Sequence, residues 1–180
     1  TWGRVMRLAV CALTYHRPEG LQRLLDRLER LETPSEHEIF VVIVDNDPDG
    51  SARPIVDSAA GEAPWNLLYE IELERGISAA RNTAVRVGLE AGADAIVFID
   101  DDVWPDADWL AEFIATQRDT GADIVTGPVL PVFDDPAPPW VLAGGFFDRP
   151  RFPHNSAIPY ATTSSVLMMR RCFEGRPVPF

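Results

Sequence analysis

One stretch, residues 95–103, constrains the fold of this chain more than any other. It begins Ala-Ile-Val-Phe-Ile and runs directly into three aspartates, Asp100, Asp101 and Asp102. The apolar part is as long as a strand, is rich in β-branched side chains and lacks polar alternation, which is typical of a strand buried on both faces. The sequence therefore predicts an α/β sheet in which the carboxylates emerge at the carboxyl end of a strand, where such sheets bind ligands.

The three aspartates are a candidate metal site. Neighbouring carboxylates at roughly 4 Å and an effective dielectric constant of about 20 repel one another by about 4 kcal/mol per pair. A divalent cation such as Mg2+ or Mn2+ removes this repulsion, prefers oxygen ligands and keeps coordination sites open for phosphate. From these residues alone, a solvated acidic turn is an equally good interpretation.

Further apolar runs alternate with helical patterns along the chain. They predict other strands at residues 8–13, 39–44, 67–71, 124–129 and 164–169. Helices are expected near residues 18–31, 52–59, 77–91 and 108–119. Strands that alternate with helices predict a mainly parallel, doubly wound sheet. Residues 133–153 are rich in Pro, Gly and aromatic side chains without a period, which predicts a long functional loop.

Composition narrows the class of protein. The 180 residues suit one domain, and the net charge of −12 argues against a nucleic-acid-binding surface while leaving nucleotide binding through a metal and a few Arg side chains. The two cysteines offer no disulfide framework and no zinc spacing, so Cys11 is expected to be a small core residue. No apolar run approaches the roughly 18 residues of a membrane span, and no signal peptide opens the chain. The chain ends look like cuts, so we expect a fragment of a longer protein.

Polar side chains follow the first two strands at the sheet edge that carries the aspartates. Thr14, Tyr15 and Arg17 follow the first strand, and Asp45 and Asn46 follow the second. An aromatic ring can stack on a base and a guanidinium can pair with a phosphate. The alternative is an ordinary amphipathic loop and, after the second strand, ordinary turn chemistry.

The segment 75–82, Arg-Gly-Ile-Ser-Ala-Ala-Arg-Asn, opens a helix after the third strand. Gly76 permits a tight turn, and the helix N-terminus favours an anion. The segment is not a dinucleotide fingerprint, because Gly-x-Gly-x-x-Gly is absent. For Arg81, a position on the helix surface is the alternative to a binding role.

Taken in order, these pieces resemble the family 2 inverting glycosyltransferases, which have the nucleotide-sugar-binding GT-A fold. The resemblance covers about residues 8–131 and rests on four segments that follow the family's order: residues 13–18, 44–46, 76–82 and 98–102. The last of these is similar to the family's Asp-x-Asp element. Residues 144–153 look like bacterial exopolysaccharide glycosyltransferases of the succinoglycan-assembly kind.

The resemblance also implies roles for individual residues. Asp45 would contact the nucleotide base, Asp100 the ribose or neighbouring groups, and Asp102 the metal. Arg75 and Arg81 would lie near the nucleotide pocket or brace it. The implied substrate-binding set is Thr14, Tyr15, Arg17, Asp45, Asn46, Arg75, Arg81, Asp100 and Asp101, and the implied metal ligands are Asp102 and Asp100.

The implied reaction transfers a sugar, with inversion, from a nucleotide-diphosphate sugar such as a UDP-hexose to a saccharide or lipid-linked acceptor in cell-surface or exopolysaccharide synthesis. Mn2+ or Mg2+ would neutralise the departing diphosphate. Residues 5–132 would form the donor-binding core and residues 133–180 the start of an acceptor-side region within one domain. The general base is expected beyond Phe180, so the fragment would bind donor without turnover.

Other features of the implied enzyme rest on the family alone. Relatives often carry Thr-Gly-Asn where this chain has Thr163-Ser164-Ser165, which leaves the acceptor side open. By analogy we hypothesise a cytoplasmic enzyme that works at the inner face of the cell membrane as a peripheral protein.

Three alternatives remain from the sequence. A Mg2+-dependent phosphatase also places Asp-x-Asp after a buried strand, but on the first strand and with Thr or Val where this chain has Trp104. A nucleotidyltransferase would need a Gly-rich basic loop after the first strand, which is absent. A non-enzymatic acidic metal-binding or interaction domain is the third.

Overall fold

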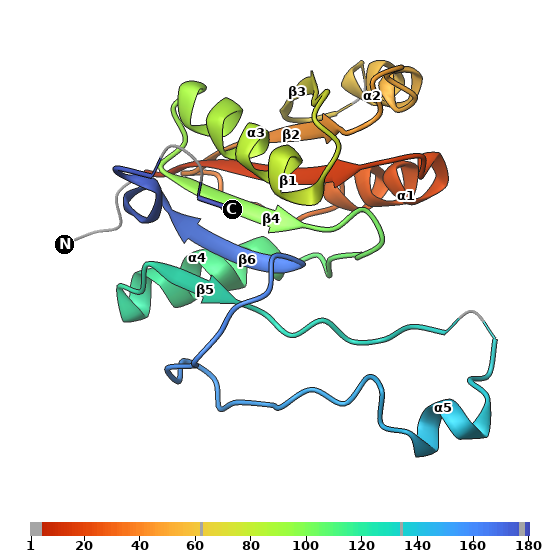
Figure 1. Cartoon of the computed structure of the whole chain (residues 1–180). Helices are drawn as coiled ribbons and strands as arrows, with labels where there is room; N and C mark the ends of the chain where they lie inside the picture. Colours follow the sequence, from red (N-terminus) through yellow and green to blue (C-terminus); the bar gives the residue numbers. More distant parts are fainter. Residues whose placement is uncertain (1–4, 62, 134, 177–178) are drawn as a thin grey trace.

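A six-stranded sheet runs through the centre of the molecule and helices cover both of its faces (Figure 1). The computed structural model describes residues 5–61, 63–133, 135–176 and 179–180. The strands are β1 (Arg7–Thr14), β2 (Glu38–Asp45), β3 (Asn66–Ile71), β4 (Ala95–Ile99), β5 (Ile124–Thr126) and β6 (Ser165–Met169), in the spatial order β3-β2-β1-β4-β6-β5. β1 to β4 are parallel, and β6 lies antiparallel between β4 and β5. The predicted mainly parallel, doubly wound sheet is confirmed.

Apolar side chains on the two faces of the sheet form two separate clusters. On one face, Leu8 and Val10 of β1 pack with three helices: α1 (Pro18–Leu28), α2 (Arg53–Ala60) and α4 (Trp109–Thr120). On the other face, Ala9 and Cys11 pack with α3 (Ile77–Glu90) and the short helix η1 (Arg170–Phe173). Alternate residues of one buried strand thus serve both layers. Cys11 is a fully buried free thiol, as predicted, and burial raises its pKa.

Gly88 brings α3 close to the sheet. A Cβ atom at this position would lie 2.6 Å from Cδ1 of Ile96 and 3.1 Å from Cβ of Ala9. The first distance is too short for two carbon atoms and the second is tight, so a side chain here would displace Ile96 or the helix. The absence of a side chain at Gly88 therefore sets how near the helix lies to β1 and β4.

Residues 127–164 form a long excursion that leaves the sheet after β5 and returns to it at β6 (Figure 1). None of the described residues in this excursion is buried. A five-residue helix, α5 (Pro139–Ala143), lies at its outer end, so the predicted loop over residues 133–153 is not a loop throughout. A second correction concerns β5, which ends at Thr126 rather than at residue 129, because Pro128 has no N–H to continue the pairing.

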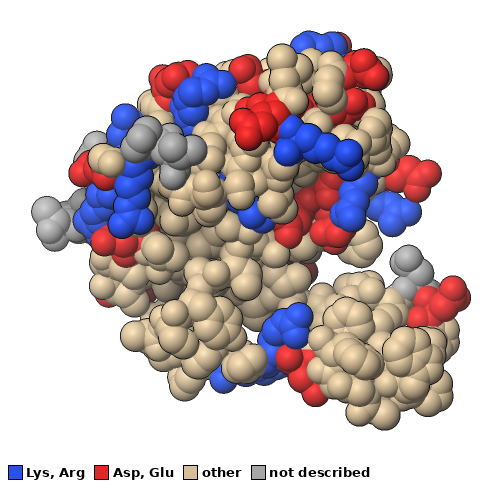
Figure 2. Space-filling model, in the orientation of Figure 1, with Lys and Arg blue, Asp and Glu red and all other residues tan. Residues whose placement is uncertain are grey.

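Part of the expected acceptor-side region, residues 133–180, returns to the central sheet as β6. β6 pairs with both β4 and β5, so residues 165–169 belong to the same sheet as the donor-side strands. Within the described part of the chain, the excursion is the segment that stands apart from the sheet. Figure 2 shows it as a largely uncharged surface separated from the body by a hollow.

Exposed apolar side chains are concentrated on the excursion. Trp140 and Leu142 of α5 are 68% and 65% exposed, and Val132 is 71% exposed. The acidic residues that give the chain its net charge lie mostly on the body instead. Among the described residues, none of the helices has the length and apolar character needed to cross a bilayer.

Candidate functional site

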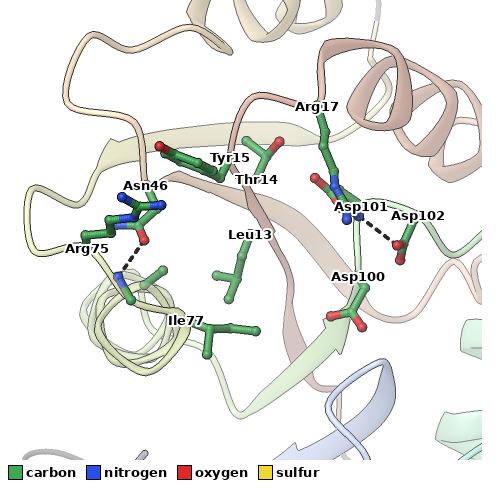
Figure 3. Close-up of a pocket in the computed structure, with 12 residues that line it drawn as sticks. Leu13, Thr14, Tyr15, Arg17, Asn46, Arg75, Ile77, Asp100, Asp101 and Asp102 are labelled. Carbon is green, nitrogen blue, oxygen red and sulfur yellow. Dashed lines mark hydrogen bonds and ion pairs between the residues drawn. The ribbon is translucent and has the colours of Figure 1, made fainter.

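An open cleft of about 490 Å³ lies at the carboxyl ends of β1 and β4, beside the N-terminus of α3 (Figure 3). This is the edge at which the sequence predicted the site. The residues that line it are Leu13, Thr14, Tyr15, Arg17, Asn46, Arg75, Gly76, Ile77, Ala80, Asp100, Asp101 and Asp102. The fold therefore brings together eight of the ten residues predicted from the sequence.

One end of the cleft is acidic and is bridged by Arg17. Nη1 of Arg17 lies 2.7 Å from Oδ2 of Asp102 and 3.2 Å from Oδ1 of Asp101. The third carboxylate, Asp100, lines the cleft without an ion pair to Arg17 and points away from it in Figure 3. A single guanidinium thus offsets part of the repulsion among three consecutive carboxylates.

The backbone of α1 fixes where this guanidinium can reach. Arg17 immediately precedes α1, and Pro18 takes the first helical position, which suits its fixed φ. Gly20 then packs against the acidic loop: a Cβ atom there would lie 2.8 Å from the backbone oxygen of Asp101. The start of α1 and the loop after β4 are therefore in direct backbone contact.

Asp101 differs from its two neighbours in its burial. Only 6% of the residue is exposed, whereas the Asp102 side chain is 60% exposed. Burial raises the pKa of Asp101, and the hydrogen bond from Thr14 and the charge of Arg17 oppose that shift. Asp101 is therefore a buried support of the loop, while Asp100 and Asp102 present oxygens to the cleft.

The other end of the cleft carries an aromatic ring and a second guanidinium. The guanidinium of Arg75 lies over the ring of Tyr15, 5.4 Å from its centroid, and Tyr15 is 41% exposed. Ile77, in the first turn of α3, is 59% exposed and adds an apolar surface between the two ends. This end can accept a planar ring system and a negatively charged group.

Asn46 holds the two sides of this end together. Its Nδ2 donates to the carbonyl oxygens of Glu72 at 2.9 Å and Glu74 at 2.8 Å, and its Oδ1 accepts from the backbone N of Gly76 at 2.9 Å. Gly76 has φ of +153°, which favours glycine, and an added Cβ atom would meet nothing within 4 Å. The chain between β3 and α3 is thus fastened to the end of β2.

Two predicted residues lie outside the cleft lining. Asp45 is fully buried and accepts hydrogen bonds from the backbone N atoms of Asp47 and Ala52 and from the Tyr69 hydroxyl. Because Asp45 is fully buried, a direct contact with a ligand requires its surroundings to move first. Arg81 lies over the ring of Phe180, 5.9 Å from its centroid.

Four uncharged cleft residues were not in the predicted binding set. Leu13, Gly76, Ile77 and Ala80 all line the cleft. Ile77 looks like an ordinary core position of an amphipathic helix, so no pattern distinguished it. Gly76 did carry a signal, because it stands between a strand and a helix start.

The described residues contain no group of three or more His, Cys, Asp or Glu side chains gathered as a ready-made metal site. The donor chemistry nevertheless suits a hard cation. Asp102 is exposed, Asp100 lines the same cleft, and Mg2+ or Mn2+ ordinarily takes one or two carboxylates and completes its coordination with water and phosphate oxygens.

Comparison with known proteins identifies the family. Residues 9–175 match the family described as "Glycosyl transferase family 2". This chain belongs to glycosyltransferase family 2. Over 139 residues it is 36% identical to the succinoglycan biosynthesis protein ExoM of Rhizobium meliloti (strain 1021), and this match covers 77% of the chain and 43% of ExoM.

Solved structures show the same fold. The mannosyltransferase PcManGT from Pyrobaculum calidifontis, in complex with GDP-Man and Mn2+, has a TM-score of 0.69 at 22% identity, covering 95% of this chain and 46% of that one. S. aureus TarS 1–349 has a TM-score of 0.65 at 21% identity, covering 94% and 48%. The predicted GT-A fold is confirmed, and the chain spans less than half the length of these relatives.

Proposed function

We propose that this family 2 glycosyltransferase chain forms the donor site of an enzyme that transfers a sugar from a nucleotide-diphosphate sugar. A UDP-hexose is the first candidate donor, and a saccharide or lipid-linked acceptor in exopolysaccharide synthesis is the candidate recipient. The observation that carries this proposal is the single cleft that joins the Tyr15–Arg75 end to the carboxylates of Asp100 and Asp102. The two ends of the cleft match the two ends of a nucleoside diphosphate: the aromatic end suits the planar base, and the carboxylates suit the cation bound to the diphosphate.

The residues would divide the donor between them. Tyr15, Ile77 and the backbone held by Asn46 would receive the nucleoside, and Arg75 would face its phosphates. Asp102 and Asp100 would hold Mn2+ or Mg2+. When bound, the cation supplies positive charge that offsets the negative charge developing on the leaving diphosphate.

The relatives support this assignment. ExoM is named for succinoglycan biosynthesis, PcManGT was solved with GDP-Man and Mn2+, and TarS 1–349 was solved with UDP-GlcNAc. Family membership favours this function over the phosphatase and nucleotidyltransferase alternatives. Inversion at the transferred sugar and work at the inner membrane face on a lipid-linked acceptor are part of the proposal.

Calorimetric titration of UDP, with GDP in parallel, tests the donor site in the presence of Mn2+ and then of a chelator. We expect micromolar, metal-dependent binding that Asp102→Asn abolishes. Asp57→Asn, an exposed aspartate on α2 outside the cleft, removes the same charge and should leave binding unchanged. Metal-independent binding, or equal binding by both variants, would contradict the proposed site. Mn2+ binding without any nucleotide effect would favour the non-enzymatic metal-binding alternative.

A further inference from the structure

A divalent cation on Asp102 would compete with Arg17 for that carboxylate. Nη1 of Arg17 lies 2.7 Å from Oδ2 of Asp102 and simultaneously 3.2 Å from Oδ1 of Asp101. A cation on Asp102 would lie about 2.0–2.2 Å from one of its oxygens, within a few Å of the guanidinium. Two positive charges so close to one another repel strongly, so the Arg17–Asp102 pair and a bound cation exclude each other.

The ion pair between Arg17 and Asp102 can open because both side chains are exposed to solvent. The side chains of Arg17 and Asp102 are 54% and 60% exposed, whereas the Asp101 side chain is only 8% exposed. An exposed ion pair contributes little to stability, so its loss costs the fold little. Asp101 also interacts with the side chain of Thr14, so Arg17 is not its sole partner.

The backbone of Arg17 is fixed, so only its side chain has to move. Its backbone is held between β1 and the first turn of α1, which contacts the Asp101 backbone at Gly20. The side chain lines the same cleft as Arg75, Gly76 and Ile77. A guanidinium released from Asp102 therefore stays in the cleft, where the phosphates of a bound nucleotide would accept it in place of the carboxylate.

We propose that Arg17 is an exchangeable counter-ion that makes cation binding depend on the nucleotide. It pairs with the acidic loop when no cation is present, and it transfers to the diphosphate when the cation enters with the nucleotide. The chain then discriminates in favour of the metal–diphosphate complex and against the free metal ion. This inference rests on the proposed donor function and adds a specificity-determining role for Arg17.

The test is a Mn2+ titration of the whole chain followed by electron paramagnetic resonance of free Mn2+, with and without UDP. Without UDP, we expect Arg17→Gln to bind Mn2+ at least about five-fold more tightly than wild type, because its competitor is gone. With UDP, the factor by which nucleotide improves Mn2+ affinity should be smaller in Arg17→Gln than in wild type. Arg17→Lys, which keeps a positive charge, should lie close to wild type.

Arg27→Gln is the matched control. It removes an equal charge from an exposed position of α1 that does not line the cleft, so Mn2+ affinity without UDP should change by less than about two-fold. Circular dichroism confirms that each variant is folded. An Arg17→Gln protein that binds free Mn2+ no better than wild type, including the case in which neither binds it, overturns the inference.

If the proposed donor site itself is wrong, the same titrations give a different result. If wild type shows no joint binding of Mn2+ and UDP, or if Asp102→Asn binds both normally, the donor site itself is wrong whatever Arg17→Gln does. If wild type binds Mn2+ and UDP together and Arg17→Gln shows unchanged affinity for free Mn2+, only the counter-ion role is wrong.

Discussion

Asn46 makes three hydrogen bonds that fasten the chain before α3 to the end of β2, although its partners lie 26 to 30 residues away in the sequence. Only 8% of the residue is exposed, so truncation would leave its partners poorly solvated. We expect Asn46→Ala to lower the free energy of unfolding by about 2–4 kcal/mol and to weaken nucleotide binding. Urea unfolding measures the first effect and calorimetry the second.

Two further variants distinguish this clamp from a general effect of the loop. Asn46→Asp keeps the acceptor for the Gly76 N–H but turns a carboxylate oxygen toward the carbonyl oxygens of Glu72 and Glu74, so it should be no more stable than Asn46→Ala. Asp49→Ala alters an exposed neighbour and should be close to neutral. If all three variants behave alike, the clamp is not the cause.

Tyr69 gives the fold a specific sensitivity to alkaline pH. Its hydroxyl donates to Oδ2 of buried Asp45 at 2.8 Å, and burial, followed by this bond, raises the pKa of Tyr69. A raised folded-state pKa means that the contribution to stability is complete below pH about 10, where the unfolded tyrosine ionises, and is lost as pH rises further. The chain has no lysine, which leaves few other groups that titrate in this window.

Between roughly pH 9.5 and 11, we expect the free energy of unfolding of wild type to fall by about 1 kcal/mol more than that of Tyr69→Phe. Urea unfolding at each pH measures this difference, and absorbance at 295 nm of the two proteins isolates the ionisation of Tyr69. Parallel pH curves for the two proteins would show that Tyr69 ionises equally in the folded and unfolded states.

At the scale of elements, the contact between α1 and the loop after β4 couples packing to the site. The Cβ atom of Gly20→Ala would lie 2.8 Å from the Asp101 backbone oxygen, which cannot move without moving the acidic loop. Overpacking of this kind costs about 1–3 kcal/mol, and the higher helix propensity of alanine offsets up to about 1 kcal/mol of this cost. We expect Gly20→Ala to have a lower Tm than wild type and to bind Mn2+ with UDP more weakly.

Gly61→Ala, at the C-terminal end of α2, is the comparison variant. Its Cβ atom would lie 3.8 Å from the Ser58 oxygen, an ordinary contact, so the Tm should be unchanged or slightly higher. Thermal unfolding followed by circular dichroism compares the two variants. An equal Tm for Gly20→Ala and wild type would mean that α1 and the acidic loop move apart freely.

At the scale of the whole molecule, the excursion is separable from the sheet. Its two ends are adjacent, since the backbone N of Gly127 donates to the Ser165 oxygen at 3.2 Å. Replacing residues 129–162 with a Gly/Ser linker of about six residues removes none of the cleft residues and shortens the loop, which favours the folded state by up to about 1.5 kcal/mol.

We expect this shortened protein to unfold cooperatively, with a Tm equal to or above that of wild type and unchanged binding of UDP with Mn2+. Differential scanning calorimetry and titration measure these properties. A protein that no longer folds would show that the exposed apolar side chains of the excursion stabilise the body.

The sequence by itself determined the sheet, its mainly parallel order and the edge at which the site lies. Uninterrupted apolar runs such as 95–99 can only be buried on both faces, and polar residues after parallel strands meet at one edge. The same local signals identified Thr14, Tyr15, Arg17 and Asn46 as residues of the cleft.

Only the tertiary structure decided what those polar residues contact. Local pattern alone did not distinguish Asp45, Asp100, Asp101 and Asp102, whose separate roles came from the family resemblance. The fold buries Asp45 and Asp101 and leaves Asp102 exposed. Burial and pairing depend on neighbours distant in the chain, such as Arg17 beside Asp102 and Tyr69 beside Asp45. Local patterns place a residue at an edge, but long-range packing sets its partner, and the partner sets its chemistry.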